Sequence, residues 1–123
     1  HLCLVPMFPR KNGCSVVENK DITETKVKAL TKAADDCWEA IMRTDLKAFA
    51  AAYRASFEAQ ISMFPAMIQP GVQDYINHYS AMDGVLAWKM PGAGGGGYLA
   101  LVIENANIFC QSVAEAIPLT IRR

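Results

Sequence analysis

The stretch from residue 84 to residue 104 reads GVLAWKMPGAGGGGYLALVIE, and it decides the fold that we expect. Two apolar runs, residues 84–90 and residues 98–104, flank Pro91 and six further positions, of which five are glycine. Apolar runs of this length between turn residues are typical of strands. The second run is almost entirely apolar, which indicates a strand in the middle of its sheet. The stretch therefore predicts two strands joined by a glycine-rich connection.

The segments around this pair follow strand or helical patterns. Residues 2–8 and 14–17 predict two short strands, and residues 119–122 predict a last one. Apolar residues at steps of three and four predict three helices before the pair and one after it, over residues 106–116.

Polar residues mark where the first two helices begin. Asp21 and Glu24 suit a capping box for the first helix. Thr44 and Asp45 suit the start of the second, which ends before Pro65 because a residue preceding proline avoids helical geometry. In each helix the apolar residues share one face, which we expect to point into the core. These residues are Val27, Leu30, Ala34, Trp38 and Ile41, then Leu46, Phe49, Ala50, Tyr53 and Phe57, then Val72, Tyr75, Ile76 and Tyr79, and last Ile108, Phe109 and Val113.

The order of these elements predicts the fold class. Strands and helices are segregated along the chain, which favours an α+β fold. The last strand–helix–strand piece indicates a ferredoxin-like antiparallel sheet with helices packed on one face and with an extra helical segment. The length of 123 residues suits a single domain over residues 1–123.

Composition and charge argue against several classes of function. The chain carries 12 basic and 12 acidic residues, so it has no net field that would attract nucleic acid. No apolar run approaches the ~20 residues of a membrane helix, and no signal peptide is visible, so we expect a cytoplasmic protein without a membrane partner. The four cysteines form no Cys-x-x-Cys pair and lie near no histidine cluster, so we expect free thiols and no metal site.

The glycine run is the main candidate for function. Glycine loses more entropy on ordering than any other residue, so five in six positions indicate that the backbone conformation is needed. Such a loop lets main-chain N–H groups converge on an anion. Gly92, Gly94 and Gly97 match the spacing of a dinucleotide site, but a strand follows them where that site requires a helix. No Gly-Lys-Ser or Gly-Lys-Thr sequence completes a Walker loop. A phosphate or substrate loop is the leading interpretation, and a flexible hairpin connection is the alternative.

The glycine run and its flanks also resemble a known family. Residues 84–97 followed by YLALVIE resemble the third motif of the GHMP kinases, which include galactokinase, homoserine kinase and mevalonate kinase. The four consecutive glycines followed by an aromatic residue are most similar to the heptose-phosphate kinase and fucokinase branches. The Pro9-Arg10 turn, the long first helix and the start of the second helix at residues 44–46 also resemble the C-terminal domain of that family.

The resemblance implies ATP- and magnesium-dependent transfer of a phosphoryl group to a sugar or sugar phosphate. It implies that residues 1–123 are the C-terminal, acceptor-binding domain of such a kinase, with a ferredoxin-like fold. Its partners would be the small-molecule substrate and the N-terminal ATP-binding domain of the same protein, which is absent from this chain. The residues that the resemblance implies for binding phosphate or substrate are Gly92, Ala93, Gly94, Gly95, Gly96, Gly97, Lys89 and Arg10.

Departures from the family pattern limit what this chain is expected to do alone. Pro91 stands where the family usually has Ser or Thr, so a hydroxyl contact is lost. The family's ATP loop, its usual catalytic base and its magnesium ligands are absent from these residues, and the chain opens at His1 directly in a predicted strand, as an excised domain would. We therefore expect no catalytic residue, no metal ligand, no bound ATP or Mg²⁺ and no kinase activity in this chain alone.

Other side chains have both a functional and a structural interpretation. Asp74 and His78 are one helical turn apart and could act in acid–base chemistry, although a surface pair is favoured. Arg54 and Glu58, at the same spacing, are expected to be structural. An acceptor pocket and a dimer contact both stay open for Met63, Phe64 and Met67.

Two classes of function follow from the sequence. The first is the acceptor-binding domain of a sugar or sugar-phosphate kinase, and the alternative is a stand-alone ferredoxin-like binding or assembly module without catalysis. Arg10 either faces the acceptor or lies in a solvated turn, and Lys89 either contacts phosphate or is a surface charge. The oligomeric state is open, and a homodimer is one of the states considered.

Overall fold

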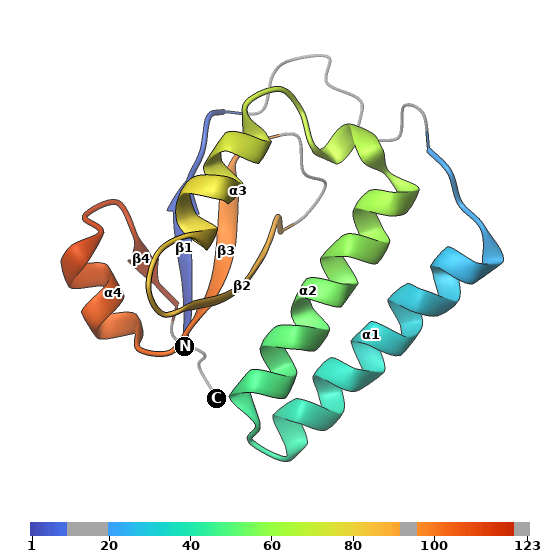
Figure 1. Ribbon diagram of the computed structural model, residues 1–123, viewed down its shortest axis with the longest axis horizontal. Helices are drawn as coiled ribbons and strands as arrows, with labels where there is room; N and C mark the ends of the chain where they lie inside the picture. The colour runs from blue at the N-terminus through green and yellow to red at the C-terminus, as the bar shows by residue number, and fades with distance from the viewer. Residues whose placement is uncertain (10–19, 92–95, 120–123) are drawn as a thin grey trace.

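A computed structural model describes residues 1–9, 20–91 and 96–119 of the chain. These residues form an α+β fold in which helices pack against a four-stranded antiparallel sheet (Figure 1), so the predicted α+β class and antiparallel sheet are confirmed. The strands are β1 (Leu2–Pro6), β2 (Val85–Lys89), β3 (Tyr98–Ile103) and β4 (Ile117–Pro118). The helices are α1 (Glu24–Met42), α2 (Leu46–Met63), α3 (Val72–Ser80) and α4 (Ala106–Ser112), with a short 3-10 turn η1 (Pro65–Met67) after α2.

The strands follow the order β2-β3-β1-β4 across the sheet. β3 lies between β2 and β1, as its apolar sequence predicts, and every residue of β3 after Tyr98 is buried. β1 pairs with β3 along its whole length, from Leu2 opposite Val102 to Pro6 opposite Tyr98. The sheet therefore joins the start of the chain to the strand that follows the glycine run. The strand predicted at residues 14–17 lies outside the described residues.

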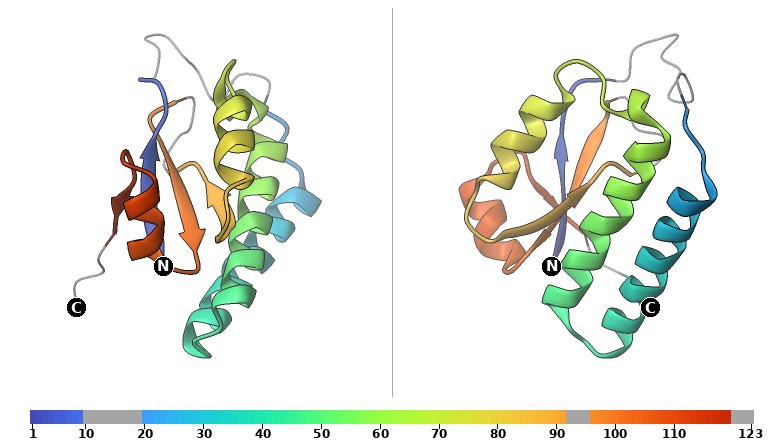
Figure 2. Two further views of the ribbon diagram at one scale, coloured as in Figure 1. Left: turned by 60° about the vertical axis from the view of Figure 1, so that its left-hand side comes forward. Right: turned by 45° about the vertical axis from the view of Figure 1, so that its right-hand side comes forward.

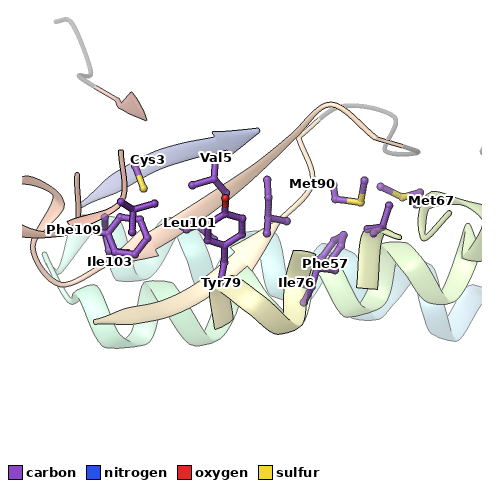
Figure 3. Packing of buried hydrophobic residues seen from close by; sticks show 13 residues of the cluster. Cys3, Val5, Phe57, Met67, Ile76, Tyr79, Met90, Leu101, Ile103 and Phe109 are labelled. Carbon is purple, nitrogen blue, oxygen red and sulfur yellow. The ribbon is translucent and has the colours of Figure 1, made fainter. Parts of the chain in front are cut away.

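The main core lies between the sheet and the helices (Figure 3). Strand residues of this core alternate along the backbone, as Cys3 and Val5 do on β1 and as Leu101 and Ile103 do on β3. Helices α2, α3 and α4 supply the opposing side chains, and burying each large apolar one contributes about 1.5–3 kcal/mol. The helix side chains labelled in Figure 3 are Phe57, Ile76, Tyr79 and Phe109.

A second, smaller cluster forms where α2 runs beside the edge strand β2. Ala50 of α2, Ala87 of β2 and Val102 of β3 are buried together there. Since Val102 points to the opposite side of β3 from Leu101, α2 contacts residues from both sides of the sheet. This position of α2 brings its side chains to the end of β2, next to the glycine run.

α1 packs on α2 at the rim of the molecule, and α2 separates it from the sheet (Figures 1 and 2). The buried residues of α1 are the small Ala33 and Ala40, which allow the two helices to approach closely. The predicted inward face of α1 is therefore wrong at four of its five positions, because only Leu30 is half-buried. The residues of that predicted face that are exposed are Val27, Ala34, Trp38 and Ile41.

Side-chain caps fix the starts of the first two helices. α1 begins after Thr23, whose Oγ1 accepts a hydrogen bond from the Lys26 amide at 3.2 Å, so the predicted capping box is not formed. Asp21 instead accepts a hydrogen bond from Lys26 Nζ at 2.6 Å. The predicted cap of α2 is confirmed, because the Asp45 side chain accepts from the Ala48 amide at 3.1 Å.

The last helix is shorter than its sequence pattern predicts. α4 ends at Ser112, because Val113 adopts an extended conformation. Phe109 and Val113 still reach the core, but Ile108 is 62% exposed, so its predicted inward position is wrong. The final strand begins earlier than expected, with Ile117 opposite Leu4, and residues 120–122 of the predicted strand lie outside the described residues.

Candidate functional site

The last residues of the glycine run are hydrogen-bonded to the residues that follow β1. Gly97 has a φ of +84°, which favours glycine, and its amide donates to the Phe8 carbonyl at 2.7 Å. The Met7 amide donates to the Gly97 carbonyl, also at 2.7 Å. Gly96 has a φ of +139°, so two of the predicted loop glycines adopt conformations that other residues rarely take. The other predicted loop residues Gly92, Ala93, Gly94 and Gly95 lie outside the described residues, as does Arg10.

Buried methionines pack in the core at the same end of the sheet. Met90, one residue past β2, is fully buried in the main core together with Met67 of η1. Met63 at the end of α2 is also buried. Because Met63 and Met67 are enclosed, they support the packing of this end, and of the three residues predicted for an acceptor or dimer contact only Phe64 is partly exposed.

Lys89 is the charged side chain that β2 places at this end. It is the last residue of β2 and pairs with Ala100 of β3, three residues past Gly97. Its Nζ donates a hydrogen bond to Ser56 Oγ at 3.0 Å and lies 5.9 Å from the centre of the Tyr53 ring. The side chain is therefore held against α2 and is half-buried, which differs from a freely solvated surface charge.

The electrostatic setting of Lys89 is unfavourable for its charge. Burial lowers the pKa of the Lys89 ammonium below its ordinary value, since the charged form loses water. No carboxylate forms a salt bridge with it among residues 1–9, 20–91 and 96–119. An ammonium carries three donors, and the structure occupies one of them with Ser56. The remaining donors and the positive charge suit an anionic ligand such as phosphate.

Two polar residues on the inward side of α2 were not predicted as site residues, and one of them, Ser56, contacts Lys89. Ser56 is 5% exposed, and its hydroxyl donates to the Tyr53 carbonyl at 2.7 Å, so its oxygen is free to accept from Lys89. One turn later the Oε1 of Gln60 is buried without a hydrogen-bond partner in the described part of the chain. The signal was present in the sequence, because Ser56 and Gln60 fall at helical spacing on the side of α2 that carries Tyr53 and Phe57.

The neighbouring charged pair is structural. Arg54 lies over the Trp88 ring, 4.4 Å from its centre, and its Nη2 is 3.7 Å from a Glu58 carboxylate oxygen. The predicted Arg54–Glu58 pair is therefore confirmed, and it is solvent-exposed. Asp74 and His78 are both exposed on α3, and no ion pair joins these two described residues. The His78 ring instead packs edge-on against Tyr79 at 4.9 Å.

An open groove of about 610 Å³ lies at the opposite end of β2 and β3. Met82, Ile108 and Phe109 contribute its apolar lining, and Asp83 and Glu104 contribute carboxylates. Negative charge at this groove disfavours a phosphate. The end of the sheet that carries Lys89 is therefore the better candidate for an anion site.

The described residues hold three free cysteines, no cluster of metal-ligating side chains and no helix suited to cross a membrane. Cys3, Cys37 and Cys110 are free thiols, buried or half-buried as predicted, and Cys14 lies outside the described residues. No group of three or more His, Cys, Asp or Glu side chains could hold a metal ion within residues 1–9, 20–91 and 96–119. Among the helices of the described chain, none combines the length and the apolar character needed to cross a membrane.

No protein-family model matches this sequence, and no curated protein matches it. The functional assignment below therefore depends on the residues of this chain and on the motif resemblance of its glycine run.

Proposed function

We propose that this chain is the acceptor-binding domain of a GHMP-type kinase that phosphorylates a sugar or sugar phosphate. In this proposal the glycine run and Lys89 form one wall of the phosphate site. The observation that carries it is the half-buried ammonium of Lys89, which has no counter-ion among the described residues and lies three positions before the glycine run.

The arrangement of the strands supports the proposed fold family. A ferredoxin-like domain follows the order strand–helix–strand–strand–helix–strand. This chain follows the same order if α1, α2 and α3 together occupy the first helical connection. We infer that α1 and α2 are the extra helical segment, because α1 packs on α2 rather than on the sheet.

The proposed chemistry divides between this chain and a second domain. Phosphoryl transfer depends mainly on positioning and on neutralising the charge of the transferred group. Lys89 would supply a positive charge, and glycine N–H groups would supply hydrogen-bond donors to phosphate oxygens. Mg²⁺ requires carboxylate or phosphate oxygens, and the described residues near Lys89 offer no carboxylate cluster. The magnesium ligands and the ATP loop would therefore come from the N-terminal domain that the resemblance implies.

Two measurements on the purified chain test this proposal. We expect no ATP hydrolysis or phosphoryl transfer by the chain alone. ATP turnover at a rate above background would contradict the proposal that a second domain supplies the ATP loop and the magnesium ligands. We expect sugar phosphates to raise the melting temperature of the chain, because a ligand that binds only the folded state stabilises it. Lys89→Ala should remove that stabilisation, whereas Lys47→Ala, at an exposed position on α2, should retain it.

The alternative is a binding or assembly module without catalysis. The folding of such a module does not require a half-buried ammonium beside a glycine run, because burying a charge without a counter-ion is unfavourable. If no phosphate-containing ligand stabilises the chain, and if Lys89→Ala leaves all binding properties unchanged, the binding-module interpretation is the better one.

A further inference from the structure

α1 presents an apolar stripe to solvent on the side that does not contact α2. Val27 is 44% exposed, Trp38 63%, Ile41 53% and Met42 67%. Val27, Ala34, Trp38 and Ile41 recur at steps of seven, four and three, so they lie on one face of the helix. Figures 1 and 2 show α1 at the rim of the molecule, and the exposed fractions show that the rest of the described chain leaves this face uncovered.

Charged residues that flank the stripe are arranged about the centre of α1 so that several of them have an opposite charge at the mirrored position. The first half carries Lys28 and Lys32, and the second half carries Asp35 and Glu39. About the point between Ala33 and Ala34 six charges form three mirrored pairs of opposite sign, whereas Lys26 and Asp36 have no charged counterpart. The mirrored pairs are Glu24 with Arg43, Lys28 with Glu39, and Lys32 with Asp35. The apolar stripe has nearly the same centre, because Val27 and Ile41 lie seven residues on either side of Ala34.

We propose that α1 pairs with α1 of a second copy of this chain, antiparallel and about a two-fold axis near Ala34. In that arrangement Val27 of one copy lies near Ile41 of the other, and Trp38 covers the middle of the stripe. A two-fold axis brings the same flank of both helices together, so Lys28 of each copy faces Glu39 of the other. A parallel pair would bring opposite flanks of the two helices together, so Lys28 of one copy would not face Glu39 of the other.

The proposed contact is compatible with the packing within each copy. The α2-facing residues Ala33 and Ala40 lie on a different side of α1 from the stripe, so α2 of each copy stays in place. The flanking charges are exposed, and Lys28 pairs with Glu24 of its own helix at 3.0 Å. The inference depends on α1 alone and is independent of Lys89 and of the proposed kinase site.

The size of the contact sets the expected affinity. A helix of 19 residues is about 28 Å long at a rise of 1.5 Å per residue. One helix pair of that length buries less than the ~1,200 Å² of a standard stable interface. We therefore expect a dimer that dissociates on dilution through the micromolar range. Because its ion pairs are exposed, the dimer should weaken as salt is added.

Sedimentation velocity over a concentration series of the chain tests the proposal. We expect a monomer–dimer equilibrium and no larger species, because the two-fold contact closes on itself. Trp38→Lys should weaken the dimer about a hundredfold or more, since both copies lose the aromatic ring. Ile108→Lys is the matched control, because Ile108 is 62% exposed on α4, and it should leave the equilibrium unchanged. A chain that stays monomeric at all concentrations, or an Ile108→Lys variant that weakens the dimer as much as Trp38→Lys, would overturn the proposal.

Charge reversal tests the antiparallel register. Lys28→Glu alone and Glu39→Lys alone should each weaken the dimer about fivefold to tenfold, because each change makes two repulsive contacts. The double variant should recover the parent affinity. If the double variant is no tighter than the single ones, the register is wrong. Circular dichroism of each variant would establish that α1 remains folded.

Cross-linking gives a second test that does not depend on affinity. Ala34→Cys should form an intermolecular disulfide on mild oxidation, because the two-fold axis passes close to this residue. Val27→Cys should not, since the two copies of that residue would lie about 20 Å apart along the helices. The parent chain, with its natural cysteines, is the background control. A strong Val27→Cys cross-link would indicate a parallel pair and contradict the proposal.

Discussion

Replacing Lys89 by methionine should stabilise the isolated chain. Methionine has a similar length and no charge, so it can occupy the same half-buried position against α2 without the cost of desolvation. Ser56 keeps its own hydrogen bond to the Tyr53 carbonyl at 2.7 Å and is not left without a partner. A residue that is retained for binding an anion, and not for folding, is expected to show this behaviour.

The size of the effect follows from two opposing contributions. The Lys89 hydrogen bond to Ser56, at 3.0 Å, stabilises the fold by about 1.5–3 kcal/mol because the donor is charged. Full burial of an ammonium without a counter-ion costs several kcal/mol, and Lys89 is only half-buried, so about half of that cost applies. With the added apolar burial of methionine, we expect Lys89→Met to raise the free energy of unfolding by about 1 kcal/mol. For a chain of 123 residues this corresponds to a rise in melting temperature of about 4 °C.

Urea and thermal unfolding followed by circular dichroism measure this change. Lys47→Met on the exposed side of α2 is the control and should change stability by less than about 0.5 kcal/mol. The folded pKa of Lys89 is lowered, so between that pKa and 10.5 the unfolded chain binds more protons and parent stability rises with pH. The advantage of Lys89→Met should therefore shrink as the pH approaches 10.5. A variant that is destabilised by about 1 kcal/mol or more would show that Lys89 is needed for folding, and would refute this reasoning.

Two further predictions concern positions away from Lys89. Gly71→Ala should lower the free energy of unfolding by about 2 kcal/mol, because φ is +94° and a Cβ would lie 3.2 Å from Phe8 Cε1. Gly84→Ala, where φ is +84° and the space around the Cβ is open, should lower it by about 1 kcal/mol. Equal losses for the two variants in urea titrations would argue against the Phe8 contact. Burial raises the pKa of the Cys3 thiol to about 11, so the free energy of unfolding should fall as pH rises from 9 through 11. At about pH 8 iodoacetamide should label Cys110 and Cys37 well before Cys3, and peptide mass spectrometry can determine this order. Rapid labelling of Cys3 in the folded chain would contradict its burial.

The fold class could be predicted because the strand and helix patterns of this sequence are strong. The run at residues 98–103 is apolar throughout, and such a run is typical of a central strand whose two faces are both buried. α1 could not be oriented from its sequence, because it carries a face of small residues and a second face of larger ones. Periodicity favoured the side with Trp38, whereas close packing on α2 selected Ala33 and Ala40.

The candidate site could be predicted only in part. The resemblance of the glycine run and its flanks to the kinase motif singles out Lys89, and the structure adds that Ser56 holds this side chain against α2. That contact joins residues 33 positions apart, and a pattern within one helix or one strand cannot reveal it. Ser56 and Gln60 do not indicate a site by their positions alone, because a polar side chain on a helix often bonds the backbone of its own helix, as Ser56 does at the Tyr53 carbonyl.

The pKa of Lys89, measured by NMR with and without inorganic phosphate, tests the central claim most directly. An anion bound at this ammonium favours its charged form, so saturating phosphate should raise the pKa from its lowered value toward 10.5 or above. Phosphate should also shift the amide signals of Gly96 and Gly97, and Lys89→Met should abolish these shifts while Lys47→Met retains them. An unchanged pKa of Lys89 in saturating phosphate, or amide shifts that persist in Lys89→Met, would contradict a phosphate site at this end of the sheet.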